Sequence, residues 1–127
     1  MSDRLSEIGQ IAITVSDIDT ALPFYRDVLG LQFLFSPAPT LAFLAAGRIR
    51  IMLSTPQGAG VVGVNSVLYF KVSDIEDTFA GVLTRGASPE RAPQLAAKMP
   101  DHDLWIGFVR DPDGNLVGMM EEKKCSK

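Results

Sequence analysis

The chain has a single histidine, His102, and acidic residues flank it on both sides, Asp101 and Asp103. Imidazole and carboxylate groups bind zinc and transfer protons. Three consecutive residues cannot easily turn to one ion, so a metal site made of these three alone is disfavoured. The pattern favours an exposed loop histidine ahead of a strand that starts at Leu104. The alternative is a general base, if that loop folds over a binding cleft.

No nucleophile stands out. Cys125 is the only cysteine and has no histidine near it in sequence, so it is not expected to act as an activated thiolate. Ser16 and Ser73 are better explained as helix caps, because nothing positions a base beside them. A single cysteine allows no internal disulfide, and a cytoplasmic location is the expectation.

Composition excludes two classes of partner. The chain has 127 residues with 12 basic and 15 acidic side chains, a net charge of −3. That balance lacks the basic stripe that nucleic acid requires. The longest apolar stretch, residues 41–47, is too short to span a bilayer. We therefore expect one domain over residues 1–127 with neither a nucleic-acid nor a membrane partner.

A short motif occurs twice and organises the chain. Residues 15–19 (VSDID) recur as residues 72–76 (VSDIE). Each copy follows an apolar run and precedes a helix-like stretch that ends at a glycine, Gly30 or Gly86. A glycine at that place suits the left-handed residue that follows many helices. Two independent segments thus predict the same strand–helix unit.

Each copy also predicts how its helix begins. The serine, Ser16 or Ser73, is expected to cap the helix, with the acid three residues on, Asp19 or Glu76, completing a capping box. Pro23 falls after the first turn of the first helix. It should cost a hydrogen bond or bend that helix slightly.

Strand signals follow both helices. The runs after the first helix are residues 31–36, 40–46 and 48–54, and those after the second are 88–94, 104–110 and 115–121. The last two flank a strong turn, residues 111–114 (DPDG). The order is βαβββ twice, an α+β fold. Module one covers about residues 8–54, a glycine-rich linker about 55–65, and module two about 66–122.

Three segments carry a family resemblance. Residues 10–18 (QIAITVSDI) and 24–31 (FYRDVLGL) resemble the opening of a vicinal-oxygen-chelate module, and residues 108–115 (FVRDPDGN) resemble its closing hairpin. The chain is thus similar to the superfamily of glyoxalases, bleomycin-resistance proteins and extradiol dioxygenases over roughly residues 8–123. The resemblance implies two βαβββ modules, each curling a four-stranded sheet, that enclose a cleft.

The resemblance also implies a metal site that this sequence does not match. In many members, histidine, glutamate or glutamine from the first and last strands of each module holds a divalent metal. The matching positions here are Gln10, Met52, Val67 and Gly118. Only Gln10 offers a hard donor, since a thioether suits soft metals and the other two side chains cannot coordinate. No metal or other cofactor is therefore expected.

Strand alternation predicts the lining of the implied cleft if Gln10 faces it. The predicted residues are Gln10, Thr14, Arg50, Met52, Val67, Tyr69, Lys71, Gly118 and Met120, with Trp105 as a further wall or else core or dimer seam. Such a surface is apolar with a few polar groups, as small-molecule pockets are. The alternative is ordinary packing for the apolar residues and solvation for the basic ones. No carboxylate falls on this face, so no acid–base pair is evident.

Three functions remain open. The favoured hypothesis is a metal-free binding protein, similar to the bleomycin-resistance branch, that holds a small amphipathic or aromatic molecule as a homodimer. The second is a glyoxalase-like lyase, an epimerase or a dioxygenase, whose displaced or metal-independent site uses Tyr69, His102 or Gln10. The third is a structural or regulatory module with a filled cleft. One scaffold hosts many chemistries, so the fold alone does not decide between them.

Overall fold

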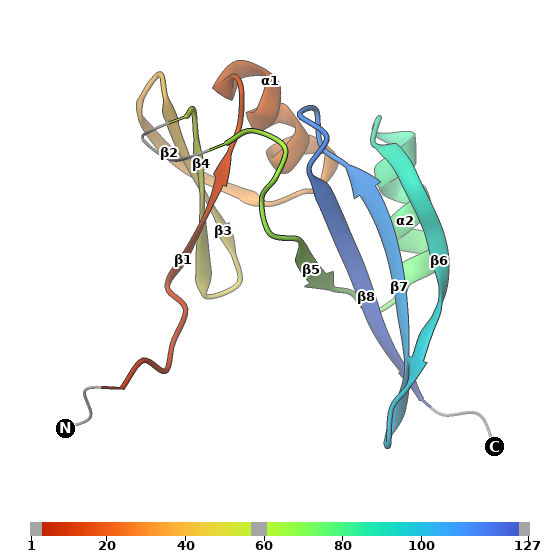
Figure 1. Ribbon diagram of the computed structural model, residues 1–127. Helices are drawn as coiled ribbons and strands as arrows, with labels where there is room; N and C mark the ends of the chain where they lie inside the picture. Colours follow the sequence, from red (N-terminus) through yellow and green to blue (C-terminus); the bar gives the residue numbers. More distant parts are fainter. Residues whose placement is uncertain (1–3, 57–60, 125–127) are drawn as a thin grey trace. The chain divides into compact units, whose positions relative to one another are not determined.

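The computed structural model describes residues 4–56 and 61–124, and Figure 1 shows their helices and strands. The chain divides into two compact units, residues 1–62 and 63–127. Each unit contains one four-stranded sheet and helical structure after its first strand. The predicted α+β order, βαβββ twice, is therefore confirmed.

The first unit is a mixed sheet with a helix on one face. Its strands are ordered β1-β4-β3-β2, with β1 parallel to β4 and the other pairs antiparallel. The elements are β1 (Gln10–Thr14), α1 (Ile18–Pro23), a π-helical segment (Phe24–Val28), β2 (Gln32–Ala38), β3 (Leu41–Ala46) and β4 (Ile49–Ser54). The parallel pair brings the first strand next to the last, which places Gln10 opposite Arg50.

The core of this unit lies between the sheet and the helical segment. Alternate strand residues such as Ile13, Leu44 and Leu53 are buried, and Tyr25 from the π-helical segment is 1% exposed. Full burial of one such side chain contributes about 1.5–3 kcal/mol. The other face of the sheet is left uncovered within this unit, and it carries the predicted site residues.

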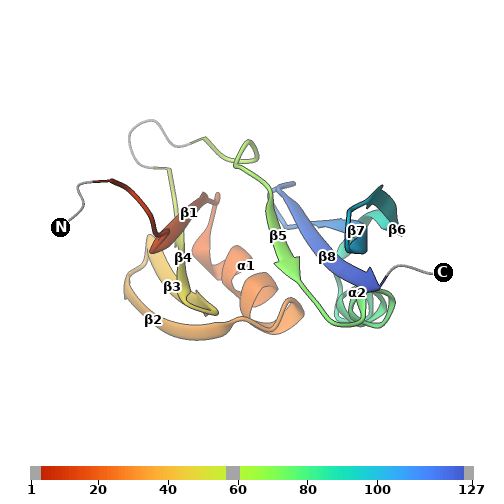
Figure 2. The ribbon, with the colours of Figure 1, turned by 90° about the horizontal axis from the view of Figure 1, so that it is seen from below.

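The second unit repeats the arrangement. Its strands are ordered β5-β8-β7-β6, with β5 parallel to β8, and Figure 2 shows α2 lying along one face of this sheet. The elements are β5 (Leu68–Lys71), α2 (Ile75–Thr84), β6 (Ser88–Lys98), β7 (His102–Arg110) and β8 (Leu116–Lys124). The helix contacts β7 and β8. Its residues Ile75, Phe79 and Val82 are buried, as are strand residues such as Val109 and Met119.

The predicted turn between β7 and β8 is present and is built around a buried carboxylate. Asp111 is 5% exposed and accepts hydrogen bonds from the backbone N–H of Asp113 and of Asn115, at 2.9 and 2.7 Å. The side-chain amide of Asn115 donates a third, at 2.8 Å. The buried charge is therefore satisfied within the hairpin that sets the β7–β8 register.

The helix caps differ from the sequence prediction by one residue. Asp17 caps α1 by accepting from the N–H of Thr20, and Asp74 caps α2 by accepting from the N–H of Asp77. The caps are thus not Ser16 and Ser73. A carboxylate at the cap position also interacts favourably with the partial positive charge of the helix N-terminus.

Two features of the helices agree with expectation. The α-helix gives way to a π-helical segment directly after Pro23, as expected where proline interrupts the hydrogen-bond pattern. Gly30 and Gly86 have φ of 88° and 109° after their helices, which confirms the left-handed glycines.

The main departure among the strands is β6, which was predicted for residues 88–94 and extends to Lys98. Its pairing with β7 shifts register three times, and such irregularities let a strand contain Pro89 and Pro93. Among residues 4–56 and 61–124, no helix is long and apolar enough to cross a membrane. Cys125 and residues 57–60 of the predicted linker lie outside the described residues.

Candidate functional site

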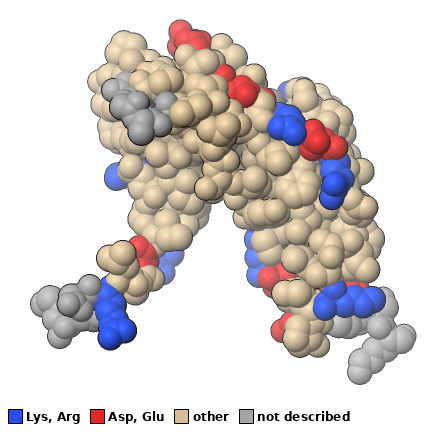
Figure 3. Space-filling view, in the orientation of Figure 1, with Lys and Arg blue, Asp and Glu red and all other residues tan. Residues whose placement is uncertain are grey.

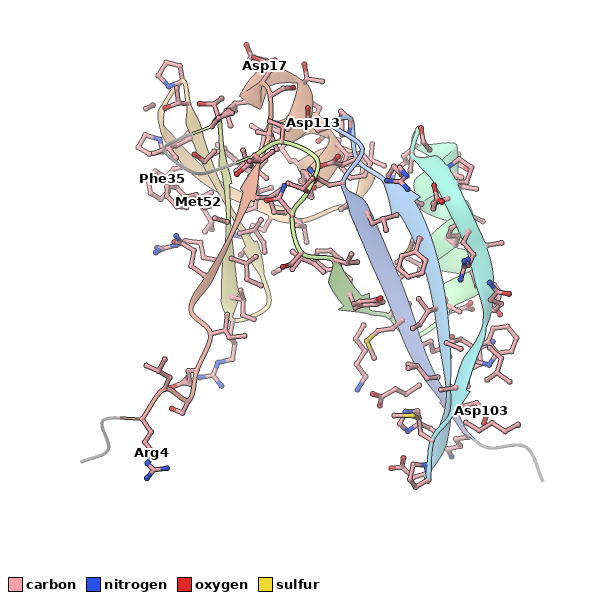
Figure 4. All side chains as sticks on the ribbon, in the orientation of Figure 1. Arg4, Asp17, Phe35, Met52, Asp103 and Asp113 are labelled. Carbon is pink, nitrogen blue, oxygen red and sulfur yellow. The ribbon has the colours of Figure 1, made fainter. Side chains whose placement is uncertain are left out.

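The uncovered face of the first sheet gathers one set of the predicted residues. The strand register pairs Gln10 with Arg50 and Ala12 with Met52. On its other side, Met52 pairs with Phe43 of β3. Phe35 of the edge strand β2 pairs with Phe43 in turn. Thr14 lies on the same face at the end of β1, because it is two positions beyond Ala12. We call this surface the first open face; Figure 4 labels Phe35 and Met52 on it.

The side chains of the first open face are joined in a chain of contacts. The Arg50 guanidinium donates from Nε to Oε1 of Gln10 at 2.7 Å. The amide of Gln10 donates from Nε2 to the sulfur of Met52 at 3.7 Å. The carbon of the guanidinium lies 5.2 Å from the centroid of the Phe43 ring, a cation–π distance. Gln10 is thus fixed by its neighbours, with its amide oxygen turned to a cationic side chain.

The uncovered face of the second sheet gathers a second set. Tyr69 pairs with Gly118, and Lys71 pairs with Met120. The Tyr69 ring fills the place of a side chain at position 118, because a β-carbon there would stand 2.7 Å from Tyr69 Cδ2. The same ring meets Phe108 edge-on, with centroids 5.7 Å apart. We call this surface the second open face.

A groove on the second unit adds residues that the sequence did not indicate. It holds about 400 Å³ and is lined by Arg91, Gln94, Leu95, Ala96, Ile106 and Phe108. The irregular pairing of β6 with β7 shapes this groove, and no local sequence pattern predicts such bulges. The one usable signal was the parity of β7, since Ile106 and Phe108 alternate with the buried Gly107 and Val109.

Trp105 does not join the predicted set. It pairs with Glu121, and Glu121 accepts a hydrogen bond from the N–H of Ile75 at the start of α2. Trp105 therefore lies on the helix-covered face of the second sheet, opposite Tyr69. There the Lys123 ammonium sits 4.3 Å from the centroid of its ring and donates to Glu76 at 2.7 Å, which lowers the pKa of Glu76.

His102 differs from the expected exposed loop residue. It is the first residue of β7, and its side chain is 18% exposed. Its Nδ1 lies 2.7 Å from a carboxylate oxygen of Asp101, and its Nε2 lies 4.0 Å from Glu122. Glu122 also pairs with Lys71 at 3.3 Å.

Glu122 corrects a second expectation about this face. The last strand was predicted to end at residue 121 but continues to Lys124. That extension brings Glu122 onto the second open face, beyond Met120 in the same alternation. The prediction that no carboxylate lies there is therefore wrong. Val67 precedes β5 and is half-buried.

A protein whose two βαβββ units each leave one sheet face open has the architecture that the sequence motifs imply. The model of the Glyoxalase/Bleomycin resistance protein/Dioxygenase superfamily matches residues 7–119. The chain therefore belongs to this superfamily.

Relatives with known names fall in more than one functional group. Virulence protein STM3117 of Salmonella typhimurium is 29% identical, with 89% of this chain and 82% of that protein aligned. Its crystal structure superposes with a TM-score of 0.78 and covers 94% of this chain and 98% of that one. Lactoylglutathione lyase of Haemophilus influenzae is 28% identical over 92% of this chain and 93% of its own.

A solved lyase structure is equally similar in fold. The crystal structure of lactoylglutathione lyase from Agrobacterium tumefaciens is 25% identical, has a TM-score of 0.78, and covers 93% of this chain and 95% of that chain. The chain thus resembles named lyases and a virulence protein to a similar degree. These similarities do not identify which of the superfamily's activities this chain has.

The four positions that the resemblance relates to metal binding do not fit a divalent ion. The amide oxygen of Gln10 is engaged by the Arg50 guanidinium, whose positive charge disfavours a second cation nearby. Met52 offers a soft sulfur, and the Tyr69 ring occupies the space at Gly118. Across residues 4–56 and 61–124, no three His, Cys, Asp or Glu side chains gather in a way that could hold a metal.

Proposed function

We propose that this protein binds a small amphipathic or aromatic molecule on its open sheet faces and does so without a metal. The observation that carries the proposal is the bond from Arg50 to Gln10. It places a guanidinium on the single hard donor among the four implied positions. The four positions therefore lack the residues that would polarise a substrate through a metal. The residues present there are suited to binding a small molecule directly.

The character of both faces supports binding. Phe35 and Tyr69 are 50% and 47% exposed, so each open face presents an aromatic side chain on which an apolar ligand can pack. Polar groups are few and defined, with Arg50 on the first open face and Lys71 on the second. Apolar surface with a few oriented polar groups is the general composition of small-molecule sites.

The groove beside β6 is large enough to contribute. Its volume of about 400 Å³ falls within the range of about 300–1,000 Å³ typical of ligand sites. Its lining combines the polar side chains of Arg91 and Gln94 with apolar ones such as Ile106 and Phe108. We include this groove in the proposed site of the second unit.

The test is a binding screen on the metal-stripped chain. A panel of aromatic and amphipathic compounds is titrated by calorimetry, once with EDTA and once with Mn²⁺, Ni²⁺ or Zn²⁺. Binding that is equal under all conditions supports the proposal, and Phe43→Ala together with Tyr69→Ala should weaken it. A screen in which binding requires added metal, or in which nothing binds, contradicts it.

A lyase is the second candidate, and two observations favour it. Relatives named lactoylglutathione lyase align over nearly the whole chain. His102 lies between Asp101 and Glu122 on the second open face, an arrangement in which an imidazole can accept a proton. Turnover of the methylglyoxal–glutathione adduct, with and without divalent metal, tests it. His102→Gln should abolish a metal-independent activity.

We also propose that the protein forms a homodimer. The edge strand β2 exposes Phe33, Leu34 and Phe35 in sequence, and no charged residue occurs between Asp27 and Arg48. In Figure 3 few charged side chains stand on the side of the first unit that faces the viewer. An apolar edge strand without charges favours association. Sedimentation equilibrium should show a dimer that Leu34→Lys weakens.

A further inference from the structure

We propose that the first open face selects planar anions, and in particular aromatic carboxylates. The ring of such a ligand would lie on the Phe35 and Phe43 side chains while its carboxylate pairs with Arg50. This inference rests on the proposed binding function and adds the class of ligand. It follows from the state of Arg50 and from what surrounds it.

The Arg50 side chain is held in place by its neighbours and has no counter-ion among the described residues. Among the described residues it has no carboxylate within ion-pair distance, whereas Lys71, Lys98 and Arg110 each have one. Its Nε is used by Gln10, but the two terminal nitrogens make no hydrogen bond within the described part of the chain. Those two nitrogens can bind both oxygens of one carboxylate.

The guanidinium is also oriented before any ligand arrives. The bond to Gln10 at 2.7 Å holds one edge, and the Phe43 ring lies under its carbon at 5.2 Å. A side chain fixed in this way loses less conformational freedom on binding than a free lysine would. Because the Gln10 amide is uncharged, it holds the Arg50 guanidinium in place without repelling a bound anion.

An aromatic shelf continues from the cation. The Phe35 and Phe43 rings stack with centroids 5.0 Å apart and an angle of 25° between their planes. Phe35, Phe43 and Arg50 come from β2, β3 and β4, three successive strands of the sheet, and lie on the same face. A flat molecule that covers Phe35 can thus direct a charged group toward Arg50. Stacking of a ligand on such rings is worth about 0.5–1.5 kcal/mol beyond the buried area.

Nothing on this face repels an anion. The strand residues on the first open face include no Asp or Glu; they are Gln10, Ala12, Thr14, Gln32, Phe35, Ala38, Leu41, Phe43, Ala45, Arg50, Met52 and Ser54. On the second open face, by contrast, Lys71 is already paired with Glu122 at 3.3 Å. The strand residues of the first open face therefore offer an anion the Arg50 guanidinium with no carboxylate beside it.

The experiment compares two probes of the same shape, 2-naphthoate and the uncharged 2-naphthamide. Their affinities are measured by calorimetry on the full chain and on two variants, Arg50→Gln and Arg48→Gln. Arg48 is an exposed arginine beside β4 without an ion pair among the described residues, so it controls for the loss of one positive charge. Circular dichroism establishes that both variants fold.

The unmodified chain should bind the naphthoate about tenfold more tightly than the naphthamide, as one charge-assisted pair predicts. Arg50→Gln should make the two affinities equal, and Arg48→Gln should keep the difference. Backbone amide shifts in nuclear magnetic resonance should move at Phe35 and Phe43. Equal affinities in the unmodified chain, or a preference that survives Arg50→Gln, would overturn the inference.

The outcomes also separate this inference from the proposed function. If naphthamide and naphthoate bind equally well at Phe35 and Phe43, the face binds small aromatics without selecting charge. Then only the anion selection is wrong. If neither probe binds, and the wider screen finds no ligand, the binding function itself is wrong and this inference falls with it.

Discussion

The ring of Tyr69 lies over Gly118, so close that a β-carbon at position 118 would stand 2.7 Å from Cδ2 and 3.2 Å from Cγ of the ring. The two residues are direct neighbours across the parallel pair β5–β8. Glycine at this position therefore does not leave a vacancy for a ligand. It allows an aromatic side chain to occupy the place and to meet Phe108 edge-on.

This contact predicts the effect of adding one methyl group. Gly118→Ala should force the Tyr69 ring away and lower the free energy of unfolding by about 1–2 kcal/mol. In a Tyr69→Ala background the same substitution should cost little, because the opposing ring is gone. Urea unfolding of the four chains in this double-mutant cycle measures the coupling. A cost of Gly118→Ala that is equal in both backgrounds would contradict the packing described.

Metal should not influence stability. Because Arg50 engages Gln10, and Gly118 is covered, neither EDTA nor Mn²⁺, Ni²⁺ or Zn²⁺ should move the unfolding temperature. The matched control is His102→Gln, which removes the one histidine and identifies any weak surface binding there. A stoichiometric ion retained by protein purified without added metal would contradict this expectation.

Much of the fold could be predicted because the same sequence motif occurs twice in the chain. The repeated motif predicted two strand–helix units. The family resemblance related Gln10, Met52, Val67 and Gly118 to one another, and the period of two along each strand then added Arg50 and Tyr69 to that set. Alternation is a local property of the backbone, so it can be read without knowledge of the partner strands.

The features that could not be predicted depend on which residues of neighbouring strands pair with one another. Glu122 and His102 resemble a polar tail and a loop, yet the β7–β8 hairpin continues pairing out to Lys124. The alternation along β7 separates Trp105 from Phe108, but the pairing of Trp105 with Glu121 is what identifies its face as the one that α2 covers. Contacts between side chains, such as the bond of Arg50 to Gln10, are equally invisible in a sequence.

The helix caps show a limit of another kind. Serine and aspartate are both good capping residues and stand side by side in each motif. In the structure Asp74 accepts from the N–H of Asp77 at 3.1 Å. Asp74→Ala should therefore cost about 1 kcal/mol of stability. Ser73→Ala should stay within about 0.5 kcal/mol, and the reverse order in urea unfolding would contradict the assignment.

The buried Asp111 should be the most sensitive polar residue of the β7–β8 turn. Asp111→Ala leaves three donors without an acceptor and should cost at least about 2 kcal/mol. Asp111→Asn keeps one side-chain oxygen for the two backbone N–H groups and should cost less. Urea unfolding ranks the two variants. Equal costs would show that the charge itself, rather than the acceptor geometry, stabilises the turn.

The ion pair between Glu76 and Lys123 predicts a pH dependence. The hydrogen bond from Lys123 holds the pKa of Glu76 below its ordinary value of 4.5. A lowered pKa in the folded state means that the unfolded chain binds the proton more readily. The contribution to stability is therefore fully present above pH 4.5 and is lost as the pH falls through the lowered value.

Lys123→Met tests this directly, since methionine can still cover the Trp105 ring. The pKa of Glu76, followed by carbon-13 resonance of its carboxyl group, should rise toward 4.5 in the variant. Glu90 is the internal control, because Arg110 lowers its pKa through a separate hydrogen bond. Its pKa should not move. A Glu76 pKa that is unchanged by the substitution would show that the ammonium does not hold this carboxylate in solution.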